Sequence, residues 1–293
     1  MRCPLCDVAC DRRTAVVTGV FEGQAYVYRQ CRACGSAACD PMPDAETLAR
    51  MYGPAYAEQD SDPCVEDPKS PQKTLDWLRQ RPSGVFVDFG CGSGSLLQAA
   101  TSLGWNAIGV EHNEGVVRDT EARTGCRVLY GLSALRGSEL PSVDVIHMGD
   151  VIEHLTAPFE VVRDLVGLLR PGGWLMAQGP LEAGPCLFTA AVRAAAQLRP
   201  RRVTEMPPYH VLQATVRGQR AFFHRVGLTE VTYDVSEVAW PAPARLSITD
   251  IKQPRKLALF LLRRLSQLCS SLNPTEWGNR YFFIGAVGGG ISE

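Results

Sequence analysis

Residues 85–94 read VFVDFGCGSG, a run of apolar residues that contains Asp88 and then continues with glycine at every second position. The apolar run predicts a buried strand. Because glycine has no Cβ atom, the turn formed by Gly90, Gly92 and Gly94 can adopt positive φ angles and approach a ligand closely. An acid directly before such a turn can accept hydrogen bonds from a cationic group of that ligand. The stretch therefore predicts a strand that ends at a turn holding a nucleotide-like ligand.

Strand and helix patterns alternate from this stretch onward. Strands are predicted at residues 107–111, 127–130, 143–148 and 174–178, and helices at residues 95–103, 114–124 and 158–169. This alternation is typical of a parallel α/β sheet, and residues 229–235 and 280–287 are predicted to complete it. In open sheets of this kind ligands bind beyond the carboxyl ends of the strands. Gly90, Glu111, Gly131 and Gly149 are therefore expected to converge on one pocket.

Glu111 ends the predicted second strand, where a carboxylate can accept hydrogen bonds from the ribose hydroxyls of a nucleoside. Two kinds of cofactor compete for this site. A dinucleotide fingerprint requires G-x-G-x-x-G, but Ser95 stands where its last glycine should be. An acid two residues before alternating glycines suits a sulfonium nucleoside with a free amino group better than a pyrophosphate. A nicotinamide oxidoreductase is therefore the weaker alternative.

Two cysteine pairs near the amino terminus, Cys3-x2-Cys6 and Cys31-x2-Cys34, have the spacing of a four-thiolate zinc site. Strands predicted at residues 15–17 and 25–28 lie between them. The pattern predicts a zinc ribbon in which the metal has a structural role, because four cysteines leave no open coordination position. Cys10 and Cys39 are competing ligands, and six scattered buried cysteines are the alternative reading.

Composition excludes several classes of protein. The 293 residues carry a formal net charge of -1, so nothing in the charge points to nucleic acid. The longest apolar stretch, residues 257–262, is far shorter than the roughly 20 residues of a membrane span. Without a signal-peptide pattern and with eleven cysteines that need not pair, a cytoplasmic location is expected.

With these motifs in place, the chain resembles the class I S-adenosylmethionine (SAM) dependent methyltransferases over most of residues 45–293. The matching motifs are the D-x-G-x-G-x-G loop at residues 88–94, the acid Glu111, the segment DVIEHL at residues 150–155 and the L-x-P-G-G turn at residues 169–173. It is most similar to the subgroup with a four-cysteine zinc ribbon followed by Pro-x-Pro and Tyr-Gly-x-x-Tyr, here residues 41–43 and 52–56. That subgroup resembles ubiquinone-type O-methyltransferases and sugar C-methyltransferases of natural-product pathways.

The resemblance implies an α/β fold, namely a Rossmann-like seven-stranded methyltransferase sheet preceded by a small zinc ribbon, with domains at residues 1–44 and 45–293. It assigns the glycine loop to the methionine part of SAM, Glu111 to the ribose, and His112 and Leu132 to the adenine. The full set implied to bind the cofactor is Asp88, Gly90, Gly92, Glu111, His112, Leu132, Met148 and Gly149. The metal ligands are Cys3, Cys6, Cys31 and Cys34.

An acceptor cap is predicted around residues 181–226. His210 is the candidate base that removes the acceptor proton, assisted by Tyr209, and a histidine that merely positions the cap is the alternative. Arg199, Arg201 and Arg202 would suit a phosphate or carboxylate on the acceptor, or form a solvated loop. A set of polar residues after the fourth strand, Asp150, Glu153 and His154, would support the cofactor or hold a divalent ion.

The expected function is methyl transfer to a small-molecule acceptor of a biosynthetic or natural-product pathway by in-line displacement. The alternative is a catalytically silent, SAM-binding adaptor that uses its ribbon to bind a partner. A carrier protein and a second copy of the chain are the partners considered, and nucleic acid is not expected. Finally, residues 255–272 form an amphipathic pattern whose leucines, Leu257, Leu261, Leu265 and Leu268, are expected to face the core, with membrane contact as the alternative.

Overall fold

The computed structural model describes residues 1–52, 69–140, 142–197, 207–238, 246, 250 and 252–288. By their internal contacts the residues group into two compact units, each made of several stretches of the chain. The first comprises Met1–Glu66, Pro180–Gln219 and Asp234–Tyr281, and the second Asp67–Gly179, Arg220–Tyr233 and Phe282–Glu293. The domain boundary at residue 44 stays a prediction.

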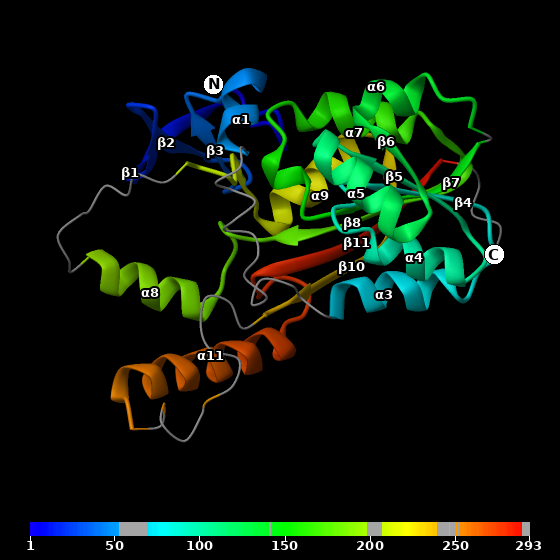
Figure 1. The fold of residues 1–293 in the computed structure, drawn as a ribbon. Helices are drawn as coiled ribbons and strands as arrows, with labels where there is room; N and C mark the ends of the chain where they lie inside the picture. The colour runs from blue at the N-terminus through cyan, green and yellow to red at the C-terminus, as the bar shows by residue number, and fades with distance from the viewer. Residues whose placement is uncertain are drawn as a thin grey trace. The chain divides into compact units, whose positions relative to one another are not determined.

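A seven-stranded sheet carries the strands expected from the glycine stretch onward, in the order β10-β11-β8-β7-β4-β5-β6 (Figure 1). Its strands are β4 (Val85–Phe89), β5 (Asn106–Glu111), β6 (Arg127–Tyr130), β7 (Val143–Gly149), β8 (Leu169–Pro180), β10 (Leu228–Ser236) and β11 (Arg280–Val287). β4 pairs in parallel with β5 on one side and with β7 on the other. The strand order therefore reverses beside β4, which is where open α/β sheets bind their ligands. The α/β prediction with a seven-stranded sheet is confirmed.

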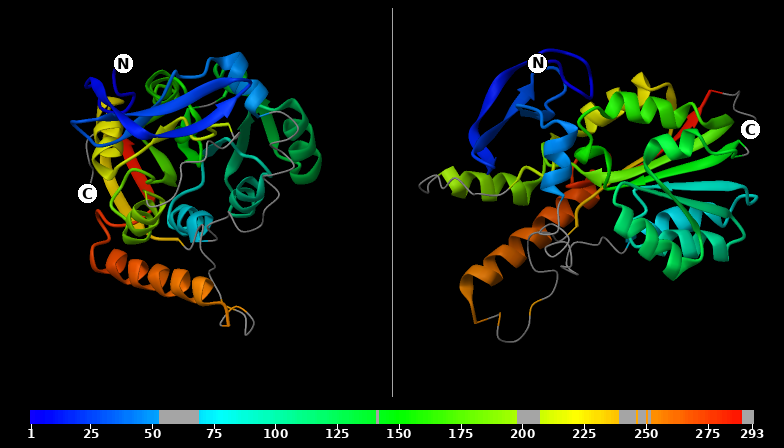
Figure 2. Two further views of the ribbon diagram at one scale, coloured as in Figure 1. Left: turned by 90° about the vertical axis from the view of Figure 1, so that its left-hand side faces the viewer. Right: turned by 45° about the horizontal axis from the view of Figure 1, so that its top comes forward.

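Helices of the second unit cover both faces of this sheet. They are α3 (Lys69–Leu78), α4 (Ser95–Ser102), α5 (Glu114–Thr124), α6 (Gly131–Arg136) and α7 (Pro158–Val166), followed by α9 (Val216–Arg225), which begins in the first unit. In Figure 1 and in the right-hand view of Figure 2, α3 and α4 lie on one face and α7 lies on the other. All five residues of β4 are buried. The glycine loop therefore starts from a strand held on both faces and both edges.

The local sequence explains where these elements begin and end. Asn113 caps α5 by accepting hydrogen bonds from the backbone N–H groups of Gly115 and Val116, and Gly125 ends the helix with a φ of 68°.

The turn predicted at residues 169–173 differs from the structure, in which these residues are part of β8. The register against β7 shifts there, from Val143 opposite Leu169 to Val145 opposite Trp174. The extra residues form a bulge, with Gly172 at a φ of 74°.

The first unit contains a four-stranded sheet in the order β1-β2-β3-β9. Its strands are β1 (Cys10–Phe21), β2 (Gln24–Cys31), β3 (Ala37–Asp40) and β9 (Leu212–Gln213). β1 and β2 form the expected hairpin, and its two turn residues, Glu22 and Gly23, both have positive φ angles, as tight hairpin turns require. Helix α1 (Ala45–Met51) follows, capped by Asp44, whose side chain accepts a hydrogen bond from the N–H of Thr47.

The fourth strand of this small sheet comes from far along the chain. β9 pairs antiparallel with β3, with Ala37 opposite Gln213 and Ala38 opposite Leu212. Cys39 extends the pairing by donating its N–H to the carbonyl of Val211. β9, which begins two residues after His210, is thus an edge strand of the cysteine-bearing sheet.

Two further helices, α8 (Leu187–Gln197) and α11 (Pro254–Leu272), belong to the first unit. The prediction that the leucines of α11 face the core is wrong. Leu261, Leu265 and Leu268 are exposed and Leu257 is half-buried, whereas Arg263, Ser266 and Ser270 are buried. The buried face of the helix carries Arg263, which is paired with Glu237. No helix in the described part of the chain is both long and apolar enough to cross a membrane.

Candidate functional site

The loop after β4 has the backbone that its glycines predict. Gly90, Gly92 and Gly94 have φ angles of 82°, 45° and 70°. The loop is fixed to the sheet, because Gly90 donates its N–H to the carbonyl of Val110 at 2.8 Å. A Cβ atom at Gly90 would lie 2.5 Å from Val151, but one at Gly92 would meet nothing within 4 Å. The backbone at Gly92 therefore faces open space, where a ligand can approach it.

Glu111, at the end of β5, lies against this loop. Its Oε2 accepts a hydrogen bond from the N–H of Gly92 at 3.2 Å, and its Oε1 accepts one from the N–H of His112 at 2.7 Å. A carboxylate offers about four lone pairs, so both oxygens can accept further hydrogen bonds. These contacts orient the carboxylate toward the edge at which a nucleoside ribose is expected.

Asp88 is buried and hydrogen-bonded to a residue that the sequence analysis missed. Oδ1 of Asp88 lies 2.7 Å from Nδ1 of His147, and both side chains are only about one-twentieth exposed. His147 is a polar residue within the otherwise apolar strand β7, and it is directly opposite Asp88 in the strand register. A histidine within an apolar strand is the sequence feature by which His147 could have been predicted as a site residue. Nε2 of His147 has no hydrogen-bond partner among the described residues.

The remaining predicted cofactor residues lie at the ends of β5, β6 and β7. His112 is exposed and its ring packs edge-on against Phe89, with centroids 5.5 Å apart. Leu132, in the first turn of α6, is half-buried. Met148 is fully buried, so its side chain belongs to the core, and Gly149 follows it at the end of the strand. These assignments to a cofactor stay predictions.

Cys91, inside the glycine loop, is a packing residue. A Cβ atom on Gly109 would lie 2.7 Å from its sulfur, which shows how closely the thiol packs on β5. Burial, assisted by the nearby charges of Asp88 and Glu111, raises the pKa of Cys91 to about 12. The thiol is therefore protonated at neutral pH and is a poor nucleophile.

The segment after β7 begins with an unusual backbone conformation. Asp150 has a φ of 54°, in the left-handed region that favours glycine, and its N–H donates to the carbonyl of Gln178. A 3-10 turn over Ile152–His154 follows, in which Glu153 is buried and Nε2 of His154 lies 4.0 Å from Oε1 of Glu153. The positive φ turns the chain sharply away from the sheet edge.

In the first unit, His210 is held at several points. Its Nδ1 lies 3.0 Å from Oε1 of Glu182, which lies two residues after β8 and was not predicted as a site residue. Tyr28 donates a hydrogen bond to the backbone carbonyl of His210, and Tyr52 donates one at 3.0 Å to that of Tyr209. The rings of Tyr52 and Tyr209 pack with centroids 5.7 Å apart. The imidazole of His210 is about one-third exposed and can reach a ligand.

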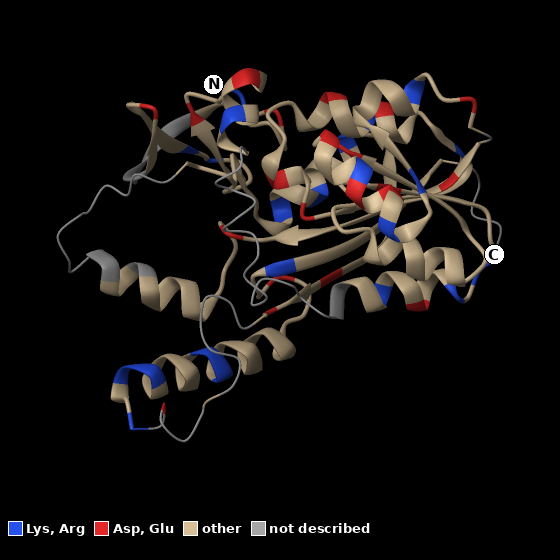
Figure 3. Cartoon of the chain, in the orientation of Figure 1, with Lys and Arg blue, Asp and Glu red and all other residues tan. Residues whose placement is uncertain are grey.

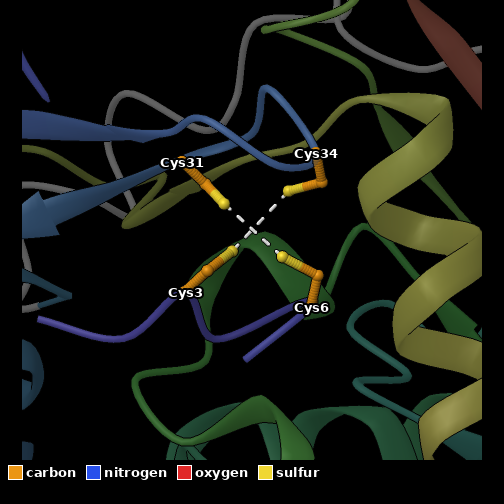
Figure 4. A group of neighbouring side chains, drawn as sticks. All are labelled: Cys3, Cys6, Cys31 and Cys34. Atoms are coloured by element: carbon orange, nitrogen blue, oxygen red, sulfur yellow. Dashed lines mark hydrogen bonds between the residues drawn. The ribbon is translucent and has the colours of Figure 1, made fainter. Parts of the chain in front are cut away.

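The four predicted metal ligands come together (Figure 4). Sγ of Cys3 lies 3.7 Å from that of Cys34, and Sγ of Cys6 lies 3.5 Å from that of Cys31. Four thiolates about 2.3 Å from a tetrahedral zinc ion would be separated by about 3.8 Å, so the cluster fits such an ion. Cys10 and Cys39 are outside the cluster, and burial raises their pKa values to about 11 and about 12.

Hydrogen bonds connect this cluster to Thr215, which follows β9. Oγ1 of Thr215 donates to the carbonyl of Cys34 at 2.7 Å, and Oγ of Ser36 accepts the N–H of Thr215 at 3.0 Å. A Cβ atom on Gly218 would lie 2.0 Å from Oγ of Ser36. The contact is therefore too close for any residue other than glycine.

Some predicted residues lie outside the described part of the chain. They are the acceptor arginines Arg199, Arg201 and Arg202, and Tyr56, the second tyrosine of the Tyr-Gly-x-x-Tyr segment.

Comparisons with known proteins agree with this geometry. Residues 87–175 match the family model described as "Methyltransferase domain". The ubiquinone biosynthesis O-methyltransferase of Burkholderia thailandensis is 30% identical over 110 residues, which cover 34% of this chain and 47% of that protein. That of Bordetella avium is 24% identical over 167 residues, which cover 54% of this chain and 64% of that protein. The chain thus spans about half to two-thirds of the length of these relatives.

Solved structures share the fold at low sequence identity. The chain is similar to a complex between the Haloferax volcanii Trm112 methyltransferase activator and a putative methyltransferase, with a TM-score of 0.51, 15% identity and coverage of 83% of this chain and 98% of that one. The [4+2]-cyclase SpnF gives a TM-score of 0.50 at 14% identity over 85% of this chain and 98% of that one. Residues 87–175 thus match a methyltransferase domain, and these two solved structures share the fold of the chain.

Proposed function

We propose that this protein transfers a methyl group from SAM to a small-molecule acceptor, an intermediate of a biosynthetic or natural-product pathway. The observation that carries the proposal is the loop at Gly92, whose backbone faces open space while its N–H is bound to Glu111. A nicotinamide cofactor is less suited to this site, since Ser95 replaces the third glycine of its fingerprint.

The residues present fit SAM. Asp88, Gly90 and Gly92 would hold its methionine part, Glu111 its ribose hydroxyls, and His112 with Leu132 its adenine, while Met148 and Gly149 would border the pocket through their backbone. When bound, SAM supplies an electrophilic methyl group on a positively charged sulfur. The buried pair of Asp88 and His147 would keep a carboxylate fixed behind the glycine loop. This arrangement orients the ligand without bringing a reactive side chain to it.

His210 is the proposed base. In an in-line displacement the bond from sulfur to the methyl carbon breaks as the acceptor atom bonds to that carbon, and the acceptor must lose a proton. Glu182, on Nδ1 of His210, would hold the imidazole in the tautomer whose Nε2 can accept this proton. Tyr209 would assist by positioning the acceptor. Such a base contributes roughly 10²–10⁴-fold to the rate.

The four cysteines are proposed to bind a structural zinc ion. None of the ten cysteines among the described residues is paired in a disulfide, which suits a reducing, cytoplasmic location. Because β9 belongs to the ribbon sheet, the metal would hold the strand next to His210 in place. A carrier protein or a second copy of the chain are the candidate macromolecular partners.

Calorimetric titration with SAM, beside a titration with NADH, tests the cofactor. We expect SAM to bind and NADH to give no signal, and the reverse result would overturn the proposal. Turnover is then followed as release of S-adenosylhomocysteine with a panel of phenols and sugars. His210→Ala should lower the rate without changing SAM affinity, while His224→Ala, an exposed histidine on α9, is the matched control. SAM binding without turnover on any acceptor would favour the silent adaptor.

A further inference from the structure

Helix α11 exposes its apolar face and buries polar residues. Leu261, Leu265, Leu268 and Leu272 are 57%, 51%, 57% and 78% exposed, and they recur at the four- and three-residue spacing of one helix face. We call these four residues the leucine stripe. Residues on the opposite side of the helix are buried, with Arg263 and Ser266 each 1% exposed and Ser270 4% exposed. The usual amphipathic arrangement is therefore inverted.

Specific contacts within the first unit hold α11 in this orientation. Arg263 forms an ion pair with Glu237 in which both side chains are 1% exposed, and its guanidinium lies 3.6 Å from the ring centroid of Phe188 in α8. Ser266 donates a hydrogen bond to the same carboxylate at 2.6 Å. Ser270 donates one to the carbonyl of Trp277. Turning the leucine stripe inward would break every one of these contacts.

The charges beside the leucine stripe have one sign. Helix α11 contains no acidic residue (Figure 3), and its Arg255, Lys256 and Arg264 are exposed. At 100° per residue, Arg255 and Arg264 lie on the two sides of the stripe. Lys256 is paired with Asp250, which precedes the helix. The exposed surface is thus an apolar stripe between two cations.

The charges beside the leucine stripe decide whether a second copy of the chain or a lipid bilayer covers it. The spacing of the leucine stripe would also fit a coiled coil with a second copy, in which Arg255 and Arg264 would occupy the flanking positions. Helix α11 has no acidic residue, so a second copy of the helix offers these arginines no opposite charge. A bilayer with anionic headgroups offers both an apolar layer for the leucines and negative charge for the arginines.

We propose that α11 is an interfacial helix that docks the protein on an anionic bilayer surface, with the leucine stripe inserted below the headgroups. The helix does not cross the bilayer and lies along it. The proposal is independent of the methyltransferase assignment, because it concerns lipid binding only.

Flotation of the full chain with vesicles of phosphatidylcholine and phosphatidylglycerol in equal parts tests it. We expect binding that weakens at high salt and is much lower on pure phosphatidylcholine. Leu265→Glu/Leu268→Glu should reduce binding by about tenfold or more, since two leucines that would insert into the bilayer are lost and two negative charges are added. The control Val231→Glu/Tyr130→Glu adds two glutamates in place of two exposed apolar residues of the second unit and should bind like the original protein.

Arg255→Gln/Arg264→Gln, which keeps the leucine stripe, should lose the preference for phosphatidylglycerol. Circular dichroism and thermal melting of each variant establish that it is folded. Failure of the folded, unmodified protein to float with anionic vesicles would overturn the proposal. It would equally be overturned by a dimer in sedimentation equilibrium that dissociates in Leu265→Glu/Leu268→Glu while vesicle binding is unaffected.

Discussion

Nδ1 of His147 lies 2.7 Å from Oδ1 of Asp88, and the two buried side chains stand opposite each other on adjacent parallel strands. A buried carboxylate without a partner is costly, so the histidine makes it possible for the acid to stand directly before the glycine loop. His147 also stacks against Phe86, with ring centroids 6.3 Å apart. We regard His147 as a residue that positions Asp88.

We expect Asp88→Asn and His147→Gln each to lower the free energy of unfolding by about 1–3 kcal/mol, because each leaves a buried polar partner unsatisfied. The double variant should lose less than the sum, with a coupling of at least about 0.5 kcal/mol. Urea unfolding of the four proteins measures this coupling. Strict additivity would mean that the two side chains do not act as a pair. Calorimetry with SAM on the same variants reports whether the pair also supports binding.

Gly92→Ala should weaken SAM binding. The residue has a φ of 45°, and a Cβ atom there would point into the open space proposed for the ligand. Gly125→Ala is the matched control, because Gly125 has a φ of 68°, also meets open space, and only ends α5. Both variants should lose about 1 kcal/mol of stability from the left-handed backbone. Only Gly92→Ala should change the SAM affinity measured by calorimetry, and equal affinities would remove Gly92 from the site.

How far the sequence predicts the structure depends on where the deciding contacts lie. β4, α5, β6 and β11 have the predicted bounds because a run of apolar residues, or a cap such as Asn113 with Gly125, is local information. The four cysteines were found for the same reason, since their paired spacing is a local signature. These elements would form in much the same way whatever lies next to them.

The features that were not predicted from the sequence depend on contacts with distant parts of the chain. The orientation of α11 is set by Glu237, which lies 26 residues before Arg263, and no periodicity reports that ion pair. β9 is only two residues long and becomes a strand by pairing with β3, some 175 residues earlier. Glu182 was overlooked because only the fold brings it to His210. Sequence patterns therefore describe elements better than the polar contacts between them.

Removal of zinc should loosen the segment around His210 as well as the ribbon. The strand pair of β3 and β9 and the hydrogen bond of Thr215 to Cys34 connect them. Cys34→Ser should lose the bound zinc and increase hydrogen exchange over residues 209–215, while Cys39→Ser, outside the cluster, should keep the metal. The zinc content of each protein is measured by releasing the metal with a thiol reagent and binding it to a chromogenic chelator. Full zinc content in Cys34→Ser would contradict the four-cysteine site.

Breaking the buried ion pair of α11 should strongly destabilise the protein. Both side chains of the pair are 1% exposed, so Arg263→Ala leaves the buried carboxylate of Glu237 without its cation. The loss of one partner of a buried ion pair lowers the free energy of unfolding by about 3–5 kcal/mol. Arg79→Ala breaks an exposed pair with Asp76 and should cost less than about 1 kcal/mol. The double variant Arg263→Met/Glu237→Leu removes both charges and should recover much of the stability, since apolar replacements of buried pairs are often neutral. Denaturant unfolding of the three variants measures the differences. If Arg263→Ala unfolded like Arg79→Ala, the ion pair would not be what holds the polar face of α11 inward, and the exposed leucine stripe would need another cause.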